Sequence, residues 1–166
     1  MQLRNAKKEE LPIIRDMRVK AYSDHKDSIP LDHWEALKNA ITSEGDVHPD
    51  VDLIIAEING EIVGSVAVFP PNSDAYEGYV DELEYPEIRM LSVSGNARGK
   101  GVATALVEEC IRRSSAKGYK AIGLHTADFM KSAMHLYERM GFERIPKYDF
   151  EPANDGIVVK AFRRFI

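Results

Sequence analysis

Cysteine is almost absent from this chain of 166 residues, since Cys110 is the only one. A single cysteine excludes a disulfide within the chain and agrees with a reducing compartment. Cys110 follows Leu106 by four residues on the apolar side of a predicted helix, so we interpret it as a small buried side chain. The chain must therefore be held by an apolar core, and at this length it can bury roughly 70% of the unfolded surface.

Long apolar runs are also missing. No run reaches the roughly 20 residues that cross a bilayer, and residues 1–8 carry no apolar stretch of the kind found in secretory signals. We therefore expect a cytoplasmic protein that has no membrane partner.

An excess of positive charge is the third absence. Lys and Arg number 22 against 27 Asp and Glu, which gives a formal net charge of −5. Nucleic-acid-binding surfaces normally show a basic stripe, so no nucleic-acid partner is expected. His125 and His135 lie on separate predicted elements, and the chain has neither H-x-x-x-H nor a cysteine pair. We therefore expect no metal site.

Apolar periodicity predicts strands and helices that alternate along the chain, as in a mixed α/β domain built around one sheet. Asn59-Gly60 lies between two β-rich runs and is the strongest hairpin signal. Residues 70–86, rich in proline and acidic residues, form a long loop of the kind that usually has a function. With no repeat or linker present, we expect one domain over residues 1–166. The expected strands are 3–6, 52–58, 61–69, 87–93, 120–126, 142–144 and 156–162, and the expected helices are 9–21, 31–42, 101–117 and 130–140.

The most informative stretch is residues 97–106, where a glycine-rich turn stands between an apolar strand pattern and a long helix pattern. At a helix start the first backbone N–H groups have no intrahelical partner, and the peptide dipoles leave partial positive charge there. Glycine allows positive φ and lets a bulky anion approach the backbone. Arg98 and Lys100 add formal positive charge. This turn therefore predicts a phosphate-binding site.

Two common phosphate motifs do not match this turn. The Walker loop needs four residues between its first glycine and Gly-Lys, followed by Ser or Thr, but only three separate Gly95 from Gly99 and Gly101 stands in the hydroxyl position. The dinucleotide fingerprint would need a glycine at Thr104 and an acidic residue after a second strand. Neither requirement is met convincingly.

The pattern Arg98-x-x-Gly101-x-Ala103 instead resembles the acyl-CoA pyrophosphate loop of the GCN5-related N-acetyltransferases, the GNAT family. The segment 133–142, AMHLYERMGF, is similar to the second hallmark of that family, A-x-x-L-Y-x-x-x-G-F, and residues 87–93 look like its central strand. The resemblance implies a central, mostly antiparallel sheet of six or seven strands flanked by helices. It also implies acetyl-CoA as co-substrate, without a metal.

The family pattern implies roles for particular residues. Tyr137 would give a hydrogen bond or a proton to the departing thiolate, and a backbone N–H near Val93 would polarise the carbonyl. Glu87 stands where some members carry the general base, although a solvated residue at a strand start is the alternative. Ser132 or Asp128 would replace an asparagine at Met130. The expected cofactor-binding residues are Leu91, Val93, Arg98, Gly99, Lys100, Gly101, Val102, Ala103, Thr104, Ser132 and Tyr137.

The resemblance thus implies an enzyme that moves an acetyl group to a primary amine of a small molecule or peptide by direct attack on the thioester. A catalytically silent acyl-CoA sensor or interaction module is the alternative. We allow for a homodimer. The family's acceptor region corresponds here to acidic and aromatic residues that would suit an amine cation or would simply be solvated. These are Tyr22, Asp24, Trp34, Glu35, Tyr76, Glu77, Tyr79, Asp81, Glu82 and Tyr148.

Overall fold

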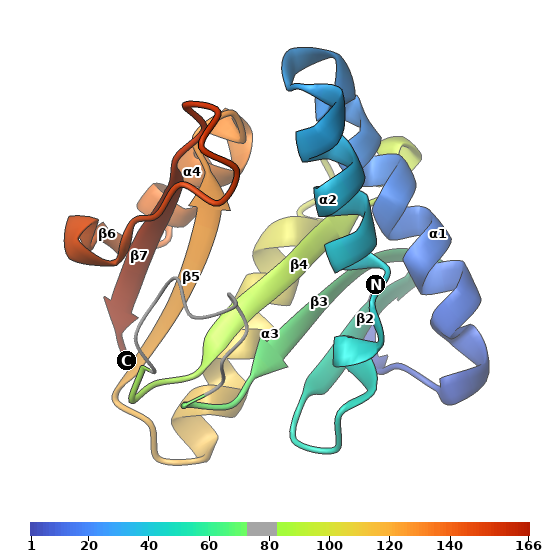
Figure 1. The fold of residues 1–166 in the computed structure, drawn as a ribbon. Coiled ribbons are helices and arrows are strands. Elements are labelled where there is room, and N and C mark those ends of the chain that lie inside the picture. Colours follow the sequence, from blue (N-terminus) through green and yellow to red (C-terminus); the bar gives the residue numbers. More distant parts are fainter. Residues whose placement is uncertain (73–82) are drawn as a thin grey trace. The chain divides into compact units, whose positions relative to one another are not determined.

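The computed structural model, which describes residues 1–72 and 83–166, contains a seven-stranded sheet in the order β1-β2-β3-β4-β5-β7-β6 (Figure 1). The strands are β1 (Gln2–Asn5), β2 (Asp52–Ile58), β3 (Glu61–Phe69), β4 (Glu87–Val93), β5 (Ala121–Ala127), β6 (Glu143–Arg144) and β7 (Val159–Phe165). The helices are α1 (Leu11–Tyr22), α2 (Leu31–Ile41), α3 (Val102–Ala116) and α4 (Lys131–Arg139). Short 3-10 turns occupy Lys8–Glu10, Ser23–Ser28, Glu44–Val47, Gly95–Ala97 and Pro146–Tyr148.

The sheet is mostly antiparallel, as expected for this mixed α/β class. The pairs β1–β2, β2–β3, β5–β7 and β6–β7 are antiparallel, whereas β4 and β5 run parallel. The expected neighbourhood of the strands near 87–93 and 120–126 is therefore confirmed. The last strand begins later than expected, at Val159 rather than residue 156, because Gly156 takes φ of 84° in the preceding turn.

The chain divides into two compact units, and each is described by itself. The first comprises Met1–Val68 and Arg89–Cys110, and the second comprises Phe69–Ile88 and Ile111–Ile166. The expectation of a single domain over residues 1–166 stays a prediction. Ten residues of the acidic loop, 73–82, including Tyr76, Glu77, Tyr79, Asp81 and Glu82, lie outside the described residues.

In the first unit, the β2–β3 hairpin turns at Asn59-Gly60 as its sequence predicts. Asn59 has φ of 51° and Gly60 has φ of 80°, the left-handed pair that a two-residue turn requires. Both strands are buried on both faces, with Ile54, Ile55 and Val66 fully inaccessible. Helix α1 buries Ile14, Met17 and Arg18, while Ile13 of the same helix is 58% exposed.

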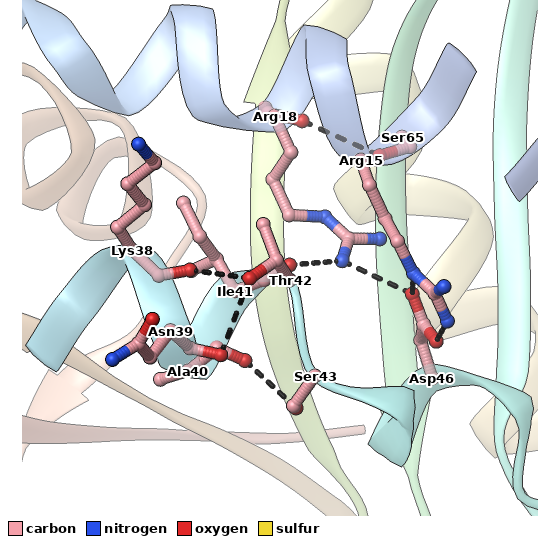
Figure 2. Close-up of polar contacts among 11 residues, drawn as sticks. Arg15, Arg18, Lys38, Asn39, Ala40, Ile41, Thr42, Ser43, Asp46 and Ser65 are labelled. Carbon is pink, nitrogen blue, oxygen red and sulfur yellow. Dashed lines mark hydrogen bonds and ion pairs between the residues drawn. The ribbon is translucent and has the colours of Figure 1, made fainter. Parts of the chain in front are cut away.

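A buried charge cluster joins α1 to the segment after α2 (Figure 2). Arg18 Nη1 donates to Asp46 Oδ2 at 3.1 Å and to the carbonyl of Ile41, the last residue of α2, at 2.6 Å. Arg15 Nη2 donates to Asp46 Oδ1 at 2.7 Å. The side chains of Arg18 and Asp46 are both fully buried. Burial lowers the pKa of Arg18, whereas the hydrogen bond to Asp46 raises that of Arg15.

In the second unit, α4 ends in a complete Schellman motif. The N–H of Phe142 donates to the Tyr137 carbonyl at 3.0 Å, and the N–H of Gly141 donates to the Glu138 carbonyl at 3.1 Å. Gly141 takes φ of 86°, which favours glycine. The turn brings the Phe142 ring against Tyr137, with ring centroids 5.8 Å apart. The Gly-Phe end of the second family hallmark is thus a helix stop with its apolar contact.

Replacing Asp46 by alanine is expected to destabilise the protein by about 3–5 kcal/mol, because Arg18 then remains as a buried charge without its carboxylate. Urea unfolding followed by circular dichroism measures the change. Asp16→Ala is the matched control, since Asp16 forms an exposed ion pair with Lys20 of the same helix, and its loss should cost at most about 0.5 kcal/mol. Equal effects of the two substitutions would contradict the role given to Asp46.

Candidate functional site

The glycine turn has the geometry of an open helix start. Gly99 and Gly101 take φ of 76° and 77°, and α3 begins at Val102. The carbonyl of Gly101 accepts the N–H of Ala105 at 3.0 Å, so the preceding N–H groups of the first turn lack an intrahelical acceptor. A Cβ built at either glycine meets nothing within 4 Å. The residues present therefore fit an anion that approaches the backbone closely.

A close approach between α3 and β3 holds this helix start in place. A Cβ at Gly64 would lie 2.8 Å from Val102 Cγ1, 3.0 Å from Leu106 Cδ1 and 3.2 Å from the Ser92 carbonyl. Glycine at position 64 is therefore required by the packing. Val102 and Leu106 are 2% and 0% exposed, so the first turn of α3 is anchored by apolar burial while its opposite side stays open.

The charged residues of the turn are exposed at its rim. Arg98 forms an ion pair with Asp24, and the two side chains are 55% and 50% exposed. Lys100 is exposed as well. Asp24, considered above as a contact for an amine cation, thus pairs with a cation of the chain itself.

Strand β4 contains a backbone irregularity that the sequence does not announce. Met90 takes φ of 56° in mid-strand, an uncommon conformation for a residue with a side chain. Such local strain costs about 1–3 kcal/mol and tends to be retained at functional sites. Beyond Met90, the N–H of Ser94 donates to the Val63 carbonyl at 2.8 Å, and Leu91 and Val93 are half-buried.

Glu87 at the start of β4 is not the solvated residue that the alternative interpretation required. It is 4% exposed, and its Oε1 lies 2.8 Å from Nδ1 of His125 on β5. The other ring nitrogen of His125, Nε2, lies 3.1 Å from the Tyr148 carbonyl. Sequence reasoning weighed His125 only as a metal ligand and missed this pair. The one available signal was a histidine within a strand pattern that is otherwise mostly apolar.

Tyr137 lies on α4 and is 6% exposed. Its ring contacts Phe142 as described and also Phe162 of β7, with centroids 6.5 Å apart. The aromatic contacts fix the ring in the second unit. Packing therefore orients the phenol, as a group that must act on one reacting atom requires.

Of the remaining residues considered from the sequence, some are exposed and others are buried or hydrogen-bonded within the fold. Ser132 is exposed in the first turn of α4. The carboxylate of Asp128 accepts the Val158 N–H at 3.1 Å, so it serves the fold there. Trp34 is 8% exposed and belongs to the core, as does Cys110, whose predicted burial is confirmed. His135 is exposed.

A model of the acetyltransferase (GNAT) family matches residues 11–142, and the chain belongs to this family. The chain is 36% identical over 94 residues to "Probable N-acetyltransferase family 8 member 5" of Mus musculus, and 34% identical over 90 residues to "Probable N-acetyltransferase camello" of Xenopus tropicalis. These matches cover 57% and 54% of this chain but 39% and 37% of the relatives.

Solved structures share the fold at low sequence identity. A protein from Corynebacterium glutamicum described as histone acetyltransferase HPA2 and related acetyltransferase has a TM-score of 0.73 at 22% identity, covering 98% of this chain and 94% of that one. The PaiA N-acetyltransferase of Thermoplasma acidophilum, solved in complex with coenzyme A, has a TM-score of 0.72 at 14% identity, with coverages of 99% and 98%. Both comparisons bear out the expected GNAT-like fold.

Within residues 1–72 and 83–166, no group of three or more His, Cys, Asp or Glu side chains is arranged to hold a metal ion. No helix in this part of the chain combines the length and apolar character needed to cross a membrane.

Proposed function

We propose that this chain is an acetyl-CoA-dependent N-acetyltransferase that moves the acetyl group to a primary amine of a small molecule or peptide. The observation that carries the proposal is the open, glycine-capped start of α3, whose backbone N–H groups lack intrahelical acceptors, in a chain that belongs to the GNAT family. Relatives named as N-acetyltransferases and a fold neighbour solved with coenzyme A support it.

The turn is assigned to the pyrophosphate of acetyl-CoA. Backbone N–H groups from Arg98 to Thr104 would donate to the phosphate oxygens, and Val102 and Ala103 lie in that first turn. Arg98 and Lys100 would add charge at the rim. The backbone of Leu91 and Val93 on β4, together with Ser132, is assigned to the pantetheine side, as the family pattern implies.

The proposed reaction requires three catalytic contributions from the chain: carbonyl polarisation, a general base and a general acid. A backbone N–H near Val93, after the irregularity at Met90, would polarise the thioester carbonyl, and such a donor is worth about 2.7–4 kcal/mol in known acyl-transfer sites. Glu87, directly or through water, would take the proton that the acceptor ammonium must lose. The amine nitrogen then bonds to the carbonyl carbon as the carbon–sulfur bond breaks, and the Tyr137 phenol would supply the thiolate's proton. The proton that the nitrogen loses as it becomes an amide would return to the phenolate through solvent, which restores Tyr137.

Thiol release from acetyl-CoA, measured across a panel of amines, is the direct test of activity. Turnover with polyamines, aminoglycosides, amino acids or peptide N-termini would support the proposal and identify the acceptor class. Tight CoA binding without turnover on any amine would favour the silent acyl-CoA sensor instead. Tyr137 favours the enzyme, because a protein that only binds acyl-CoA has no thiolate to protonate.

Gly101→Glu should weaken CoA binding by about tenfold or more, because it adds bulk and negative charge where the phosphates are assigned. Titration calorimetry with CoA measures the effect. Gly118→Glu is the matched control: Gly118 also has positive φ and open space at its Cβ position, but it follows the other end of α3. Lys100→Ala should weaken binding less than Gly101→Glu. Equal CoA affinities for Gly101→Glu and the wild type would refute the site.

Asp24→Asn should tighten CoA binding by about two- to fivefold, because it removes a carboxylate that competes with phosphate for Arg98. The gain should shrink at high salt, since both side chains are half exposed. Asp27→Asn, in the same 3-10 turn, controls for the change in net charge. An equal gain from Asp27→Asn would show that the pair with Arg98 plays no part.

Tyr137→Phe should lower kcat by roughly ten- to a thousandfold and leave acetyl-CoA affinity within a few-fold, because the lost interaction strengthens only in the transition state. A purely structural hydroxyl would cost at most about 1 kcal/mol of stability and leave turnover alone. Rate and melting temperature are measured on one preparation, with Tyr119→Phe as control. Unchanged kcat under conditions where chemistry limits the rate would rule out the acid role.

A further inference from the structure

Glu87 and His125 form a buried polar pair between the two parallel strands of the sheet. The strands are in register at Glu87↔Gly123 and Ile88↔Leu124, so His125 follows the paired segment directly. The side chains of Glu87 and His125 are 5% and 1% exposed, with Oε1 and Nδ1 2.8 Å apart. The Phe150 ring packs against the imidazole, with centroids 5.6 Å apart. Substrate therefore has no access to the imidazole itself.

The protons of this pair can be counted from the geometry. A backbone carbonyl carries no proton, so Nε2 of His125 must be the donor toward Tyr148. One further proton lies between Nδ1 and Oε1, and it belongs either to an imidazolium facing a carboxylate or to a neutral imidazole facing a carboxylic acid. In both arrangements Nε2 is already protonated. His125 therefore cannot pass a proton on to Tyr148, and the chain of hydrogen bonds ends there.

The Tyr148 carbonyl is itself held firmly. Arg144 binds the neighbouring carboxylate of Asp149 through two hydrogen bonds, at 2.8 and 2.5 Å, and the Ala161 N–H adds a third at 2.8 Å. Burial raises the pKa of Asp149, but the hydrogen bonds from Arg144 and Ala161 more than offset this, and the pKa falls below its usual value. Asp149 is therefore an anion at neutral pH.

A further ionisable group close to Glu87 is Tyr85, which also lies near the charged Arg163. The Tyr85 ring lies over Gly123, so that a Cβ there would meet Tyr85 Cε2 at 2.4 Å. Burial raises the pKa of Tyr85 to about 12, so this phenol stays neutral at physiological pH. The electrostatic neighbours of the pair within the described residues thus include a neutral phenol and an anion. A buried ionic pair seldom adds stability over a well-packed apolar pair, so its presence calls for a role in chemistry.

We propose that His125 is the positioning residue of the general base: it fixes the orientation of the Glu87 carboxylate and, as a charged donor, keeps that carboxylate ionised so that it can take the acceptor's ammonium proton. This inference rests on the proposed function, in which Glu87 is the base. His125 acts only through Glu87. The backbone carbonyl of Tyr148 completes the arrangement by accepting a hydrogen bond from Nε2, which fixes the orientation of the ring.

The test compares pH profiles of kcat and KM for the wild type, His125→Phe, His125→Gln and Glu87→Gln, with an amine acceptor found in the panel. His125→Phe keeps a ring against Phe150 but removes the donor. Without the donor the Glu87 carboxylate is harder to ionise, so we expect the acid limb of the kcat profile of His125→Phe to move to higher pH by about one to two units. We also expect kcat at neutral pH to fall about ten- to a hundredfold. KM for acetyl-CoA should change by no more than about threefold.

The same pH profiles distinguish a wrong base assignment for Glu87 from a wrong positioning role for His125. His125→Gln offers the carboxylate a neutral N–H, and it should restore part of the kcat lost in His125→Phe and return the acid limb partway. If Glu87→Gln keeps the rate and the acid limb of the wild type, the proposed base is wrong. If Glu87→Gln loses both while His125→Phe and His125→Gln match the wild type, the positioning role of His125 is overturned and the base assignment stands.

A spectroscopic measurement covers the case in which His125→Phe does not fold, as judged by its melting curve. Nitrogen-15 NMR of the wild type should show His125 protonated at both Nδ1 and Nε2 across the pH range of the assay. In Glu87→Gln the imidazole should become neutral while Nε2 stays protonated, because the amide then donates to Nδ1. A wild-type His125 in which either ring nitrogen is unprotonated would overturn the proposal without any activity assay.

Discussion

The proposed anion-binding turn depends on the contact between α3 and β3 at Gly64. Because no side chain stands at position 64, Val102 and Leu106 pack directly against the strand, and the first turn of α3 is held by complete apolar burial. A rigid first turn presents its N–H groups in a fixed direction, which a frayed helix end could not do. The positive φ of Gly99 and Gly101 can shape an anion site only because the packing against β3 fixes the first turn of α3.

Buried charge recurs in the structure, and each instance is paired. Arg18 meets Asp46 and the C-terminal carbonyl of α2, and Glu87 meets His125. The attraction within such a buried pair offsets little more than the free energy lost on desolvation, so neither pair is explained by stability alone. The first pair ties α1 to the chain beyond α2, which specifies how the first unit packs. The second pair sits on the strand to which the family pattern assigns the base, and we connect it with proton transfer.

The two sequence hallmarks turn out to be physically different kinds of signal. The Arg98–Ala103 pattern describes a backbone shape, since its glycines supply positive φ and its helix start supplies donors. The pattern from Ala133 to Phe142 is largely a helix with its stop signal, because Gly141 and Phe142 complete a Schellman motif over Tyr137. Local motifs of this type are readable because propensity, periodicity and capping act within a few residues of one another.

The sequence by itself determined the order of the elements, both strands of the hairpin at Asn59-Gly60, the glycine turn and the position of Tyr137, all of which follow from local rules. It did not determine that Ile13 faces solvent while Arg18 is buried, that Met90 breaks the regularity of β4, or that Glu87 meets His125, 38 residues away. Those outcomes depend on strand register and on which groups meet inside a low-dielectric core, where a polar side chain must find a partner. Only the tertiary structure decides them, because the partners are distant in the chain and no local sequence pattern indicates which residues will meet.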